Sequence, residues 1–342
     1  MRRDYDESDA RVRPNRRGSR PRSKRRPAHE DAIPGTVVGV DRGRFAVSLD
    51  DGVALTAVKA RELGRRGLVV GDRVALVGDT SGSEGSLARI VRREQRATEL
   101  RRTADDSDPT ERVVVANAHQ LAIVTALADP EPNPRMIDRC LVAAFDAGME
   151  ALLVLTKGDL ASADALRAAY EPLGVTVLTT TMRRDGEART IDGLGGLREA
   201  LEERATVLVG YSGVGKSTLV NALVPDADRA TGVVNDVTGR GRHTSTSAVA
   251  LDLPDGGRII DTPGVRTFGL AHVETAHLLA AFEDLDEVAA GCPRGCTHAA
   301  DSPDCALDDW VRASPDEDVR AARTARLTSF RRLLASRSGG SD

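Results

Sequence analysis

The sequence predicts a multidomain protein, with a small N-terminal β-barrel, a central doubly wound α/β domain and a C-terminal, mostly helical module. Three observations support this architecture. Short alternating strands crowd residues 31–95, strand and helix signals alternate over residues 111–270, and three of the four cysteines cluster after residue 290. A chain of 342 residues has room for two or three domains, and its 40% apolar content is enough to form their cores.

The first 30 residues form a basic tail. They carry a net charge of +6, whereas the whole chain carries −4, and the stretch from Arg11 to Arg26 contains nine basic residues and no acidic one. Such a run is typical of disorder and of binding to a polyanion, although a merely solubilising tail would have the same composition. The acidic remainder argues against coating of DNA by the whole protein. The 3% aromatic content disfavours base-stacking platforms.

Residues 31–95 have the pattern of a small barrel. Five β-prone runs lie at 35–40, 44–49, 52–56, 72–77 and 87–91, and Asp50-Asp51-Gly52 is a hairpin turn signal. This spacing predicts an OB-fold, which commonly binds nucleic acid, with an SH3-like barrel as the alternative. Residues 96–110 are charged and poor in apolar residues, so we interpret them as a linker.

Residues 111–270 alternate between strand and helix signals. Strands are expected at 112–116, 121–126, 151–155, 175–179 and 206–209, and helices near 135–147, 162–171, 194–204 and 216–224. This alternation is typical of a doubly wound α/β domain. Cys140 stands alone in an Ala-rich helix and is expected to be a core residue.

A phosphate-binding loop lies between the strand at 205–209 and the following helix. It comprises Gly210, Tyr211, Ser212, Gly213, Val214, Gly215, Lys216, Ser217 and Thr218. Glycines let backbone N–H groups turn onto phosphate oxygens, and the helix N-terminus adds a favourable dipole. Lys216 would reach the β- and γ-phosphates, and the Ser217 hydroxyl would ligate Mg²⁺. The flanking strand and helix make a chance match a poor alternative.

Two further segments would complete the phosphate site. Asp261 ends an apolar strand about 50 residues after the phosphate loop and would hold Mg²⁺ through water, while the N–H of Gly264 would bond the γ-phosphate. Asp-x-x-Gly is also a common turn, but this spacing favours function. Residues 239–247 are rich in glycine and hydroxyls, which predicts a loop that closes on nucleotide. One of Thr244, Ser245 and Thr246 would then complete the Mg²⁺ shell. A flexible polar loop is the alternative.

A base-reading loop is predicted at Thr156, Lys157, Gly158 and Asp159, directly after a strand. Asp159 would accept hydrogen bonds from the N1–H and 2-amino group of guanine, and the Lys157 stem would lie along the base. An ordinary strand-to-helix loop is the alternative. Asn usually begins this motif, so Thr156 predicts a modest loss of nucleotide affinity. Residues 179–181 are a weaker candidate for a contact with the base.

The order of the motifs is informative. In an ordinary GTPase the base-reading motif follows the phosphate motifs, whereas here it precedes them. The sequence therefore predicts a circularly permuted α/β P-loop GTPase domain.

The C-terminal region contains a candidate metal centre. Cys292, Cys296, His298 and Cys305 make a Cys₃His set, which suits one structural, tetrahedral Zn²⁺. Unpaired cysteines or a disulfide are the alternatives, and a disulfide is disfavoured inside cells. The sequence after Cys305 looks helical and basic. We expect its arginines to face RNA or solvent; they are Arg320, Arg323, Arg326, Arg331 and Arg332.

The barrel, the permuted GTPase domain and the Cys₃His module, in that order, resemble the ribosome small subunit-dependent GTPase A family over roughly residues 34–335. The expected division is a tail at 1–30, an OB-fold barrel at 31–95, a linker at 96–110, a GTPase domain at 111–270 and a zinc-binding helical domain at 271–342. The resemblance implies hydrolysis of GTP to GDP and phosphate, stimulated by the small ribosomal subunit and its rRNA, during late maturation of that subunit.

The resemblance also bears on catalysis. Val265 follows Gly264, where many GTPases place a water-orienting Gln, and an apolar side chain cannot orient water. By resemblance, His243 is the candidate for this task. A solvent-facing loop histidine is the alternative.

Three other functions compete with this hypothesis. A permuted GTPase acting on the large subunit would lack the barrel and the cysteine cluster, and a P-loop kinase or ATPase would lack the Lys157/Asp159 pair. An RNA-binding scaffold with nucleotide-gated binding and little hydrolysis stays open. No run of 18 uncharged apolar residues and no signal peptide is visible, so we expect a cytoplasmic monomer that does not contact membranes.

Overall fold

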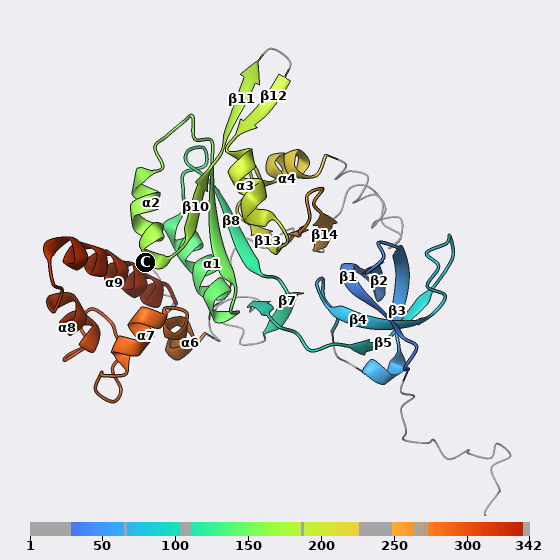
Figure 1. Ribbon diagram of the computed structural model, residues 1–342, viewed down its shortest axis with the longest axis horizontal. Coiled ribbons are helices and arrows are strands. Elements are labelled where there is room, and N and C mark those ends of the chain that lie inside the picture. The colour runs from blue at the N-terminus through green and yellow to red at the C-terminus, as the bar shows by residue number, and fades with distance from the viewer. Residues whose placement is uncertain are drawn as a thin grey trace, which may run out of the picture.

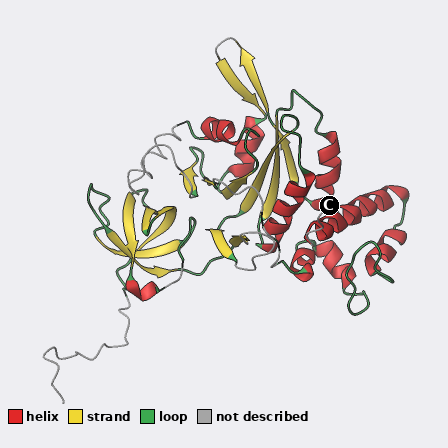
Figure 2. Cartoon of the chain, turned by 180° about the vertical axis from the view of Figure 1, so that it is seen from behind, coloured by secondary structure: helices red, strands yellow, loops and turns green. Residues whose placement is uncertain are grey.

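The computed structural model describes residues 29–64, 67–102, 111–185, 188–225, 248–262, 268, 270 and 273–337. They form three bodies in a row, which are an N-terminal barrel, a central α/β domain and a C-terminal helical module (Figure 1). Figure 2 shows that helices gather in the central and C-terminal bodies, whereas the N-terminal body is almost entirely strand and loop. The predicted multidomain architecture is confirmed.

The barrel has five strands and a short 3₁₀ helix. They are β1 (Ile33–Asp41), β2 (Arg44–Leu49), β3 (Ala54–Lys59), η2 (Arg61–Leu63), β4 (Arg73–Gly78) and β5 (Ala88–Arg93). The pairing order β1-β2-β3-β5-β4 closes when β4 pairs with β1, and β3 and β5 run parallel. Apolar side chains such as Phe45 and Leu76 fill its interior. This five-stranded closure fits the predicted OB-type barrel.

The central sheet contains six strands. They are β8 (Gln120–Ala126), β9 (Glu150–Thr156), β10 (Thr176–Thr179), β13 (Ala205–Val209), β14 (Val249–Asp252) and β15 (Arg258–Asp261). Their order is β10-β9-β8-β13-β15-β14, and every pair is parallel except β14–β15. Strand β8 is buried throughout, and consecutive residues such as Ala122 and Ile123 enter opposite cores. Such a strand needs helices on both faces.

Helices cover both faces of this sheet. Helix α1 (Pro134–Asp146), α2 (Asp164–Tyr170) and η3 (Glu171–Leu173) lie on one face, and α3 (Leu194–Leu201) and α4 (Lys216–Leu223) lie on the other. Asn133 caps α1 by accepting a hydrogen bond from the Met136 N–H at 3.1 Å. Cys140 in α1 is fully buried, as predicted, and burial raises the pKa of its thiol to about 12.

Two strand pairs were not expected from the sequence. Strand β6 (Glu99–Arg102) lies inside the predicted linker and pairs with β7 (Arg112–Ala116). Strands β11 (Thr181–Asp185) and β12 (Ala188–Asp192) form a hairpin that projects from the carboxyl edge of the central sheet (Figure 1). The Asp185-Gly186 turn signal between them was available in the sequence.

The C-terminal module consists of α6 (Thr275–Ala280), α7 (Glu283–Ala289), α8 (Ala306–Arg312) and α9 (Glu317–Arg337). Phe282 joins this module to the central domain. The centroid of its ring lies 5.0 Å from that of Phe145 in α1 and 5.4 Å from that of Phe330 in α9, and both pairs meet edge-on. No helix in the described part of the chain is long and apolar enough to cross a membrane.

The arginines of α9 have a different role from the one expected. Arg323, Arg326, Arg331 and Arg332 all make contacts within the protein, so the prediction that they face RNA or solvent is wrong for these four. Their partners are the Trp310 carbonyl at 2.7 Å, Asp284 at 2.6 Å, Asp308 at 2.8 Å and Asp138 at 3.1 Å, respectively. Arg320 alone of the five has only a loose surface pair, with Glu317 at 3.4 Å, among the described residues.

Candidate functional site

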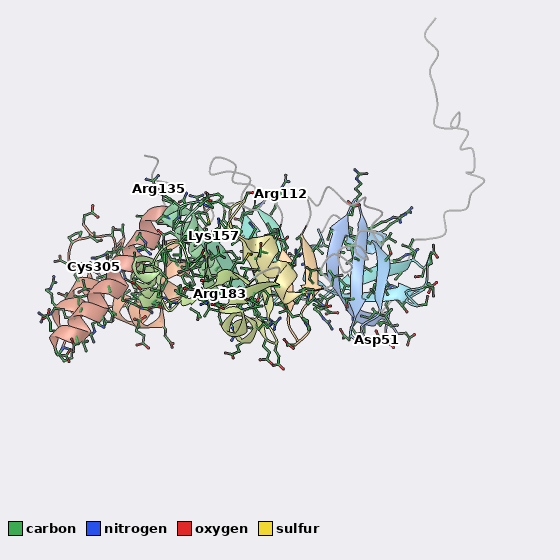
Figure 3. All side chains as sticks on the ribbon, turned by 90° about the horizontal axis from the view of Figure 1, so that it is seen from above. Asp51, Arg112, Arg135, Lys157, Arg183 and Cys305 are labelled. Carbon is green, nitrogen blue, oxygen red and sulfur yellow. The ribbon has the colours of Figure 1, made fainter. Side chains whose placement is uncertain are left out.

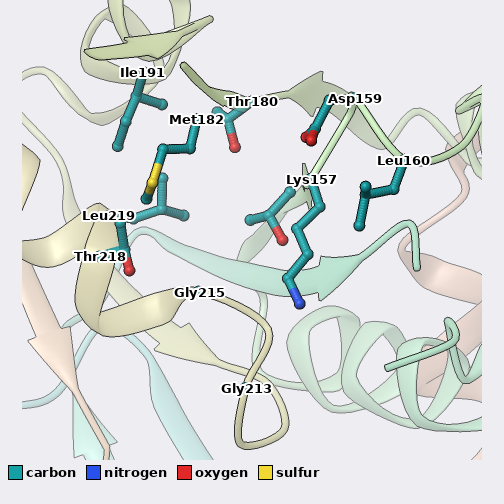
Figure 4. Close-up of a pocket in the computed structure, with 11 residues that line it drawn as sticks. Lys157, Asp159, Leu160, Thr180, Met182, Ile191, Gly213, Gly215, Thr218 and Leu219 are labelled. Carbon is teal, nitrogen blue, oxygen red and sulfur yellow. The ribbon is translucent and has the colours of Figure 1, made fainter. Parts of the chain in front are cut away.

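The phosphate loop and the base-reading loop meet at one edge of the central sheet. Strands β9 and β13 end at Thr156 and Val209, and the sheet brings their carboxyl ends to the same edge. A pocket of about 350 Å³ opens there (Figure 4). Its lining residues are Thr156, Lys157, Asp159, Leu160, Thr180, Met182, Ile191, Gly213, Gly215, Thr218 and Leu219. The base-reading loop and the phosphate loop, which are far apart in the sequence, thus share one cavity.

The phosphate loop has the tight backbone that its glycines permit. Gly210 has φ +148°, and a Cβ there would lie 2.2 Å from the Val124 carbonyl oxygen, so no larger residue fits. Helix α4 begins at Lys216, whose Nζ donates to the carbonyls of Gly210 and Tyr211, the latter at 2.8 Å. Ser217 is exposed beside it. A helix N-terminus, an ammonium group and an accessible hydroxyl therefore converge where an anion would bind.

Thr156 links the two loops directly. Its side chain is buried, and its hydroxyl donates to the Val214 carbonyl of the phosphate loop at 2.6 Å. The Leu127 N–H donates to the Thr156 carbonyl at 3.0 Å from the neighbouring strand end. A hydroxyl in place of the usual amide thus still binds the base-reading loop to the phosphate loop.

Asp159 is held at the mouth of the pocket by backbone contacts of its loop. The Gly158 N–H donates to the Thr180 carbonyl at 3.2 Å, and the Thr180 N–H donates to the Leu155 carbonyl at 2.7 Å. The Asp159 carboxylate remains exposed. Thr180, from the segment predicted as a weaker base contact, also lines the pocket. A carboxylate fixed at an open edge suits a base with two adjacent N–H donors.

Sequence reasoning missed four apolar residues of the pocket, which are Leu160, Met182, Ile191 and Leu219. Figure 4 shows Met182, Ile191 and Leu219 on one side of the cavity and Lys157 and Leu160 on the other. The available signal was the position of Leu160 and Met182, each a large apolar residue directly after a polar loop.

Asp261 ends strand β15, the neighbour of the strand that feeds the phosphate loop. Burial raises the pKa of its carboxyl, and the nearby charge of Lys216 partly offsets this rise. The Thr262 hydroxyl anchors the strand end by donating to the Leu208 carbonyl at 3.0 Å. The remaining predicted site residues, His243, Thr244, Ser245, Thr246 and Gly264, lie outside the described residues.

The four predicted metal ligands come together in the C-terminal module. Figure 3 shows one of them, Cys305, well apart from Lys157 of the nucleotide pocket. The ligand atoms of Cys292, Cys296, His298 and Cys305 all lie within 4.8 Å of one another. Both Cys292 Sγ and Cys296 Sγ are 3.6 Å from His298 Nδ1, and Cys292 Sγ is 4.0 Å from Cys305 Sγ. Zn–S and Zn–N bonds of about 2.3 and 2.0 Å in a tetrahedron place the ligand atoms roughly 3.5–3.8 Å apart, which is close to these three separations. The four residues therefore fit such an ion.

Neighbouring groups support the metal cluster. Arg331 of α9 donates from Nε to the His298 carbonyl at 3.0 Å and pairs with both oxygens of Asp308 at 2.8 Å. The Ala306 N–H donates to Cys292 Sγ at 3.3 Å. Burial and the charge of Arg331 lower the pKa of His298, which favours the neutral, metal-binding imidazole.

Comparison with known proteins agrees with this geometry. A model of the RsgA GTPase family matches residues 93–271. The small ribosomal subunit biogenesis GTPase RsgA of Pseudomonas syringae pv. tomato is 40% identical over 276 residues, which span 79% of this chain and 75% of the relative. The protein of the same name from Gemmatimonas aurantiaca is 36% identical over 313 residues, or 89% of this chain and 98% of the relative.

Solved structures share the fold. YjeQ from Thermotoga maritima has a TM-score of 0.59 and 25% identity, with 89% of this chain and 99% of that chain covered. YloQ, described as a circularly permuted GTPase, has a TM-score of 0.60 and 20% identity, with 90% and 98% covered. The family match, the sequence relatives and the joined nucleotide motifs agree, and the chain belongs to the RsgA GTPase family.

Proposed function

We propose that this chain binds the small ribosomal subunit and hydrolyses GTP to GDP and phosphate during late maturation of that subunit, with turnover stimulated by the subunit. Relatives from Pseudomonas and Gemmatimonas carry small-subunit biogenesis in their names. The observation that carries the proposal for this chain is that Asp159 shares one pocket with Gly213 and Gly215 of the phosphate loop. GTP requires a guanine reader and a phosphate cradle at this separation.

On the phosphate side, the backbone N–H groups of residues 210–218 would cradle the phosphates, and Lys216 would bind the β- and γ-phosphates. Mg²⁺ would be held by the exposed Ser217 hydroxyl and, through water, by Asp261. A bound Mg²⁺ neutralises phosphate charge. We assign the γ-phosphate contact to Gly264. The last hydroxyl ligand of Mg²⁺ would come from Thr244, Ser245 or Thr246.

On the base side, Asp159 would accept from the N1–H and 2-amino group of guanine, while the Lys157 stem and Gly158 border the ring. Thr156 keeps this loop in register with the phosphate loop through its bond to Val214. Adenine offers no matching pair of donors, so a carboxylate here discriminates strongly against ATP.

For hydrolysis, a water molecule must be oriented for in-line attack on the γ-phosphate. Val265 cannot do this because its side chain is apolar. We assign the task to His243, whose imidazole can orient a water when its loop closes on the nucleotide.

The metal of the C-terminal cluster is assigned as Zn²⁺. Three thiolates and one imidazole are the ligands of structural zinc, and four protein ligands leave no open position for catalysis. The barrel and the basic tail are the candidate contacts with rRNA of the small subunit. The protein is expected to work as a cytoplasmic monomer.

The decisive experiment is GTP hydrolysis by the full chain with purified small subunits, with large subunits and ATP as controls. Strong, GTP-specific stimulation by small subunits alone is the expected result, and His243→Ala should lose the stimulation while retaining GTP binding. Tight GTP binding without any stimulation would contradict the proposal and favour an RNA-binding scaffold. Stimulation by large subunits alone would move the activity to the other subunit.

A further inference from the structure

Two exposed apolar side chains face the nucleotide pocket. Among the described residues, the exposed large hydrophobics are Ile33, Leu87, Leu160 and Met182. Two of these four, Leu160 at 55% exposure and Met182 at 36%, line the same cavity from opposite sides (Figure 4). An apolar side chain left open to water at a pocket is a common mark of a surface that a ligand covers.

Hairpin β11–β12 supplies the wall that contains Met182. Met182 and Ile191 are directly paired across the two strands, and both line the pocket. Leu219 of α4 adjoins them and is itself buried, so the wall has a packed support. The same pair also lines a neighbouring hollow with Ser217 and Thr218. The wall therefore runs from the base-reading edge to the start of the phosphate-loop helix.

This wall is fixed relative to the base-reading loop. Thr180, two residues before Met182, accepts from the Gly158 N–H at 3.2 Å and donates its own N–H to the Leu155 carbonyl at 2.7 Å. The residue just before the hairpin, Thr180, is therefore hydrogen-bonded to the loop that carries Asp159. If the edge of a planar base met Asp159, Lys157 and Leu160 would lie on one side of the base and Met182 on the other (Figure 4).

We infer that Met182, backed by Ile191, covers one face of the guanine ring and makes hairpin β11–β12 part of the nucleotide site. This inference rests on the proposed GTPase function and deepens it by assigning an affinity-determining residue. A flexible thioether adapts to a flat aromatic surface and makes favourable sulfur–ring contacts. The contact is apolar, so it adds affinity without reading the base. Asp159 alone sets the preference for guanine.

Substitutions of Met182 should therefore change the affinity for the nucleotide and leave the preference for guanine unchanged. Met182→Ala should weaken GDP binding by about three- to tenfold, mainly through faster dissociation, because most of the apolar surface that covers the ring is lost. Met182→Leu should stay within about twofold of wild type, because it keeps the apolar volume. All variants should keep the preference for GDP over ADP. Leu87→Ala, which removes an exposed apolar side chain from the barrel, is the matched control.

A direct readout comes from methionine methyl resonances of the full chain, which contains four methionines. Met136 and Met149 are buried, whereas Met182 is open to the pocket. On saturation with GDP, the Met182 methyl resonance, identified by its absence in Met182→Leu, should move upfield through the ring current of guanine. A role confined to folding would not produce this shift.

The outcomes separate the inference from the function on which it rests. If the wild-type chain does not bind GDP at all, the proposed GTPase function fails first. If GDP binds, yet the Met182 methyl does not shift and Met182→Ala binds GDP within twofold of wild type, the guanine-wall assignment is overturned. A shift together with faster dissociation supports it.

Discussion

The central domain meets its two neighbours in different ways. The barrel is joined largely through the backbone, since β1 pairs with β14 at Gly39 and Val249 and the Ala116 N–H donates to the Val70 carbonyl at 3.0 Å. The C-terminal module is joined through side chains, chiefly Phe282 and the arginines of α9. A backbone joint depends weakly on any one side chain, whereas a side-chain joint can be lost by a single substitution.

Each joint has a distinctive ion pair, which is fully buried at the barrel and half-buried at the module. At the barrel, Arg96 grips both oxygens of Asp72 at 2.6 and 2.9 Å, and the two side chains are 6% and 0% exposed. Gly71 beside it admits no larger residue, because a Cβ would lie 1.8 Å from the Ala116 carbonyl oxygen. At the module, two consecutive arginines of α9 contact different parts of the protein. Arg331 holds the metal cluster through His298, and Arg332 holds Asp138 of the central domain.

Removal of the metal should have the largest effect. Chelation, or Cys305→Ser, should destabilise the C-terminal module by roughly 5 kcal/mol or more, because zinc-binding energy is folding energy in such modules. Trp310 is the only tryptophan and lies in α8 just after Cys305, so its fluorescence reports the module. Metal content should be measured in parallel. Trp310 fluorescence and protease resistance that do not change after metal loss would contradict a structural ion.

Arg332→Met should have the next largest effect. It leaves the buried Asp138 carboxylate without its charged partner. The expected loss of stability is about 3 kcal/mol, the lower end of the cost of breaking a buried pair, because Arg332 is 33% exposed and Tyr170 still hydrogen-bonds Asp138. Urea denaturation followed by Trp310 fluorescence measures this loss. Arg320→Met on the same helix is the matched control and should cost about 0.5 kcal/mol or less, because the Arg320–Glu317 pair is exposed.

The Arg332→Met defect should also depend on pH. Burial raises the pKa of Asp138, while Arg332 opposes that rise. Without Arg332 the folded-state pKa rises further above the unfolded value, so the folded variant binds the proton more tightly than the unfolded chain. The loss of stability is then greatest near neutral pH and shrinks as the pH falls through the raised pKa of Asp138. An equal loss at pH 7 and pH 5 would argue against the charge as its cause.

Asn117→Ala should have a smaller effect than Arg332→Met. Asn117 donates to the Gly71 carbonyl and accepts from the Ala97 N–H, both at 2.8 Å, and it adopts φ +54°, which Asn tolerates well. Loss of these two hydrogen bonds should lower the free energy of unfolding by about 1–2 kcal/mol. The barrel should nevertheless stay docked through its backbone pairs, so small-angle scattering should give an unchanged radius of gyration. A clear increase would show that this joint, too, depends on one side chain.

Local patterns predicted the fold well where the elements are regular. The five barrel strands, most strands and helices of the central domain and the Cys₃His cluster follow from periodicity, turn signals and residue spacing, whereas strand β14 was not expected. Strand β6 was missed because its charged sequence, Glu99–Arg102, forms a strand only through pairing with β7. Pairing of this kind is a tertiary property that propensity does not encode.

Long-range partners explain the other differences. The arginines of α9 look solvent-exposed in sequence, but Arg332 meets a carboxylate 194 residues away. Thr156 suggested a weakened base-reading motif, and only the fold brings its hydroxyl to Val214, 58 residues away. The effect of Thr156 on nucleotide affinity stays a prediction. Met182 belongs to no motif, and its position in the pocket depends on the hairpin that carries it.

The most direct measurement is hydrolysis of GTP and xanthosine triphosphate, with small subunits present, by the wild-type chain and by Asp159→Asn. Xanthine carries a carbonyl where guanine carries the 2-amino group, so an amide at position 159 matches it. The wild-type chain should prefer GTP strongly, and Asp159→Asn should reverse the preference while keeping stimulation by the subunit. If Asp159→Asn hydrolyses GTP as well as the wild-type chain does, the pocket described here does not read the base.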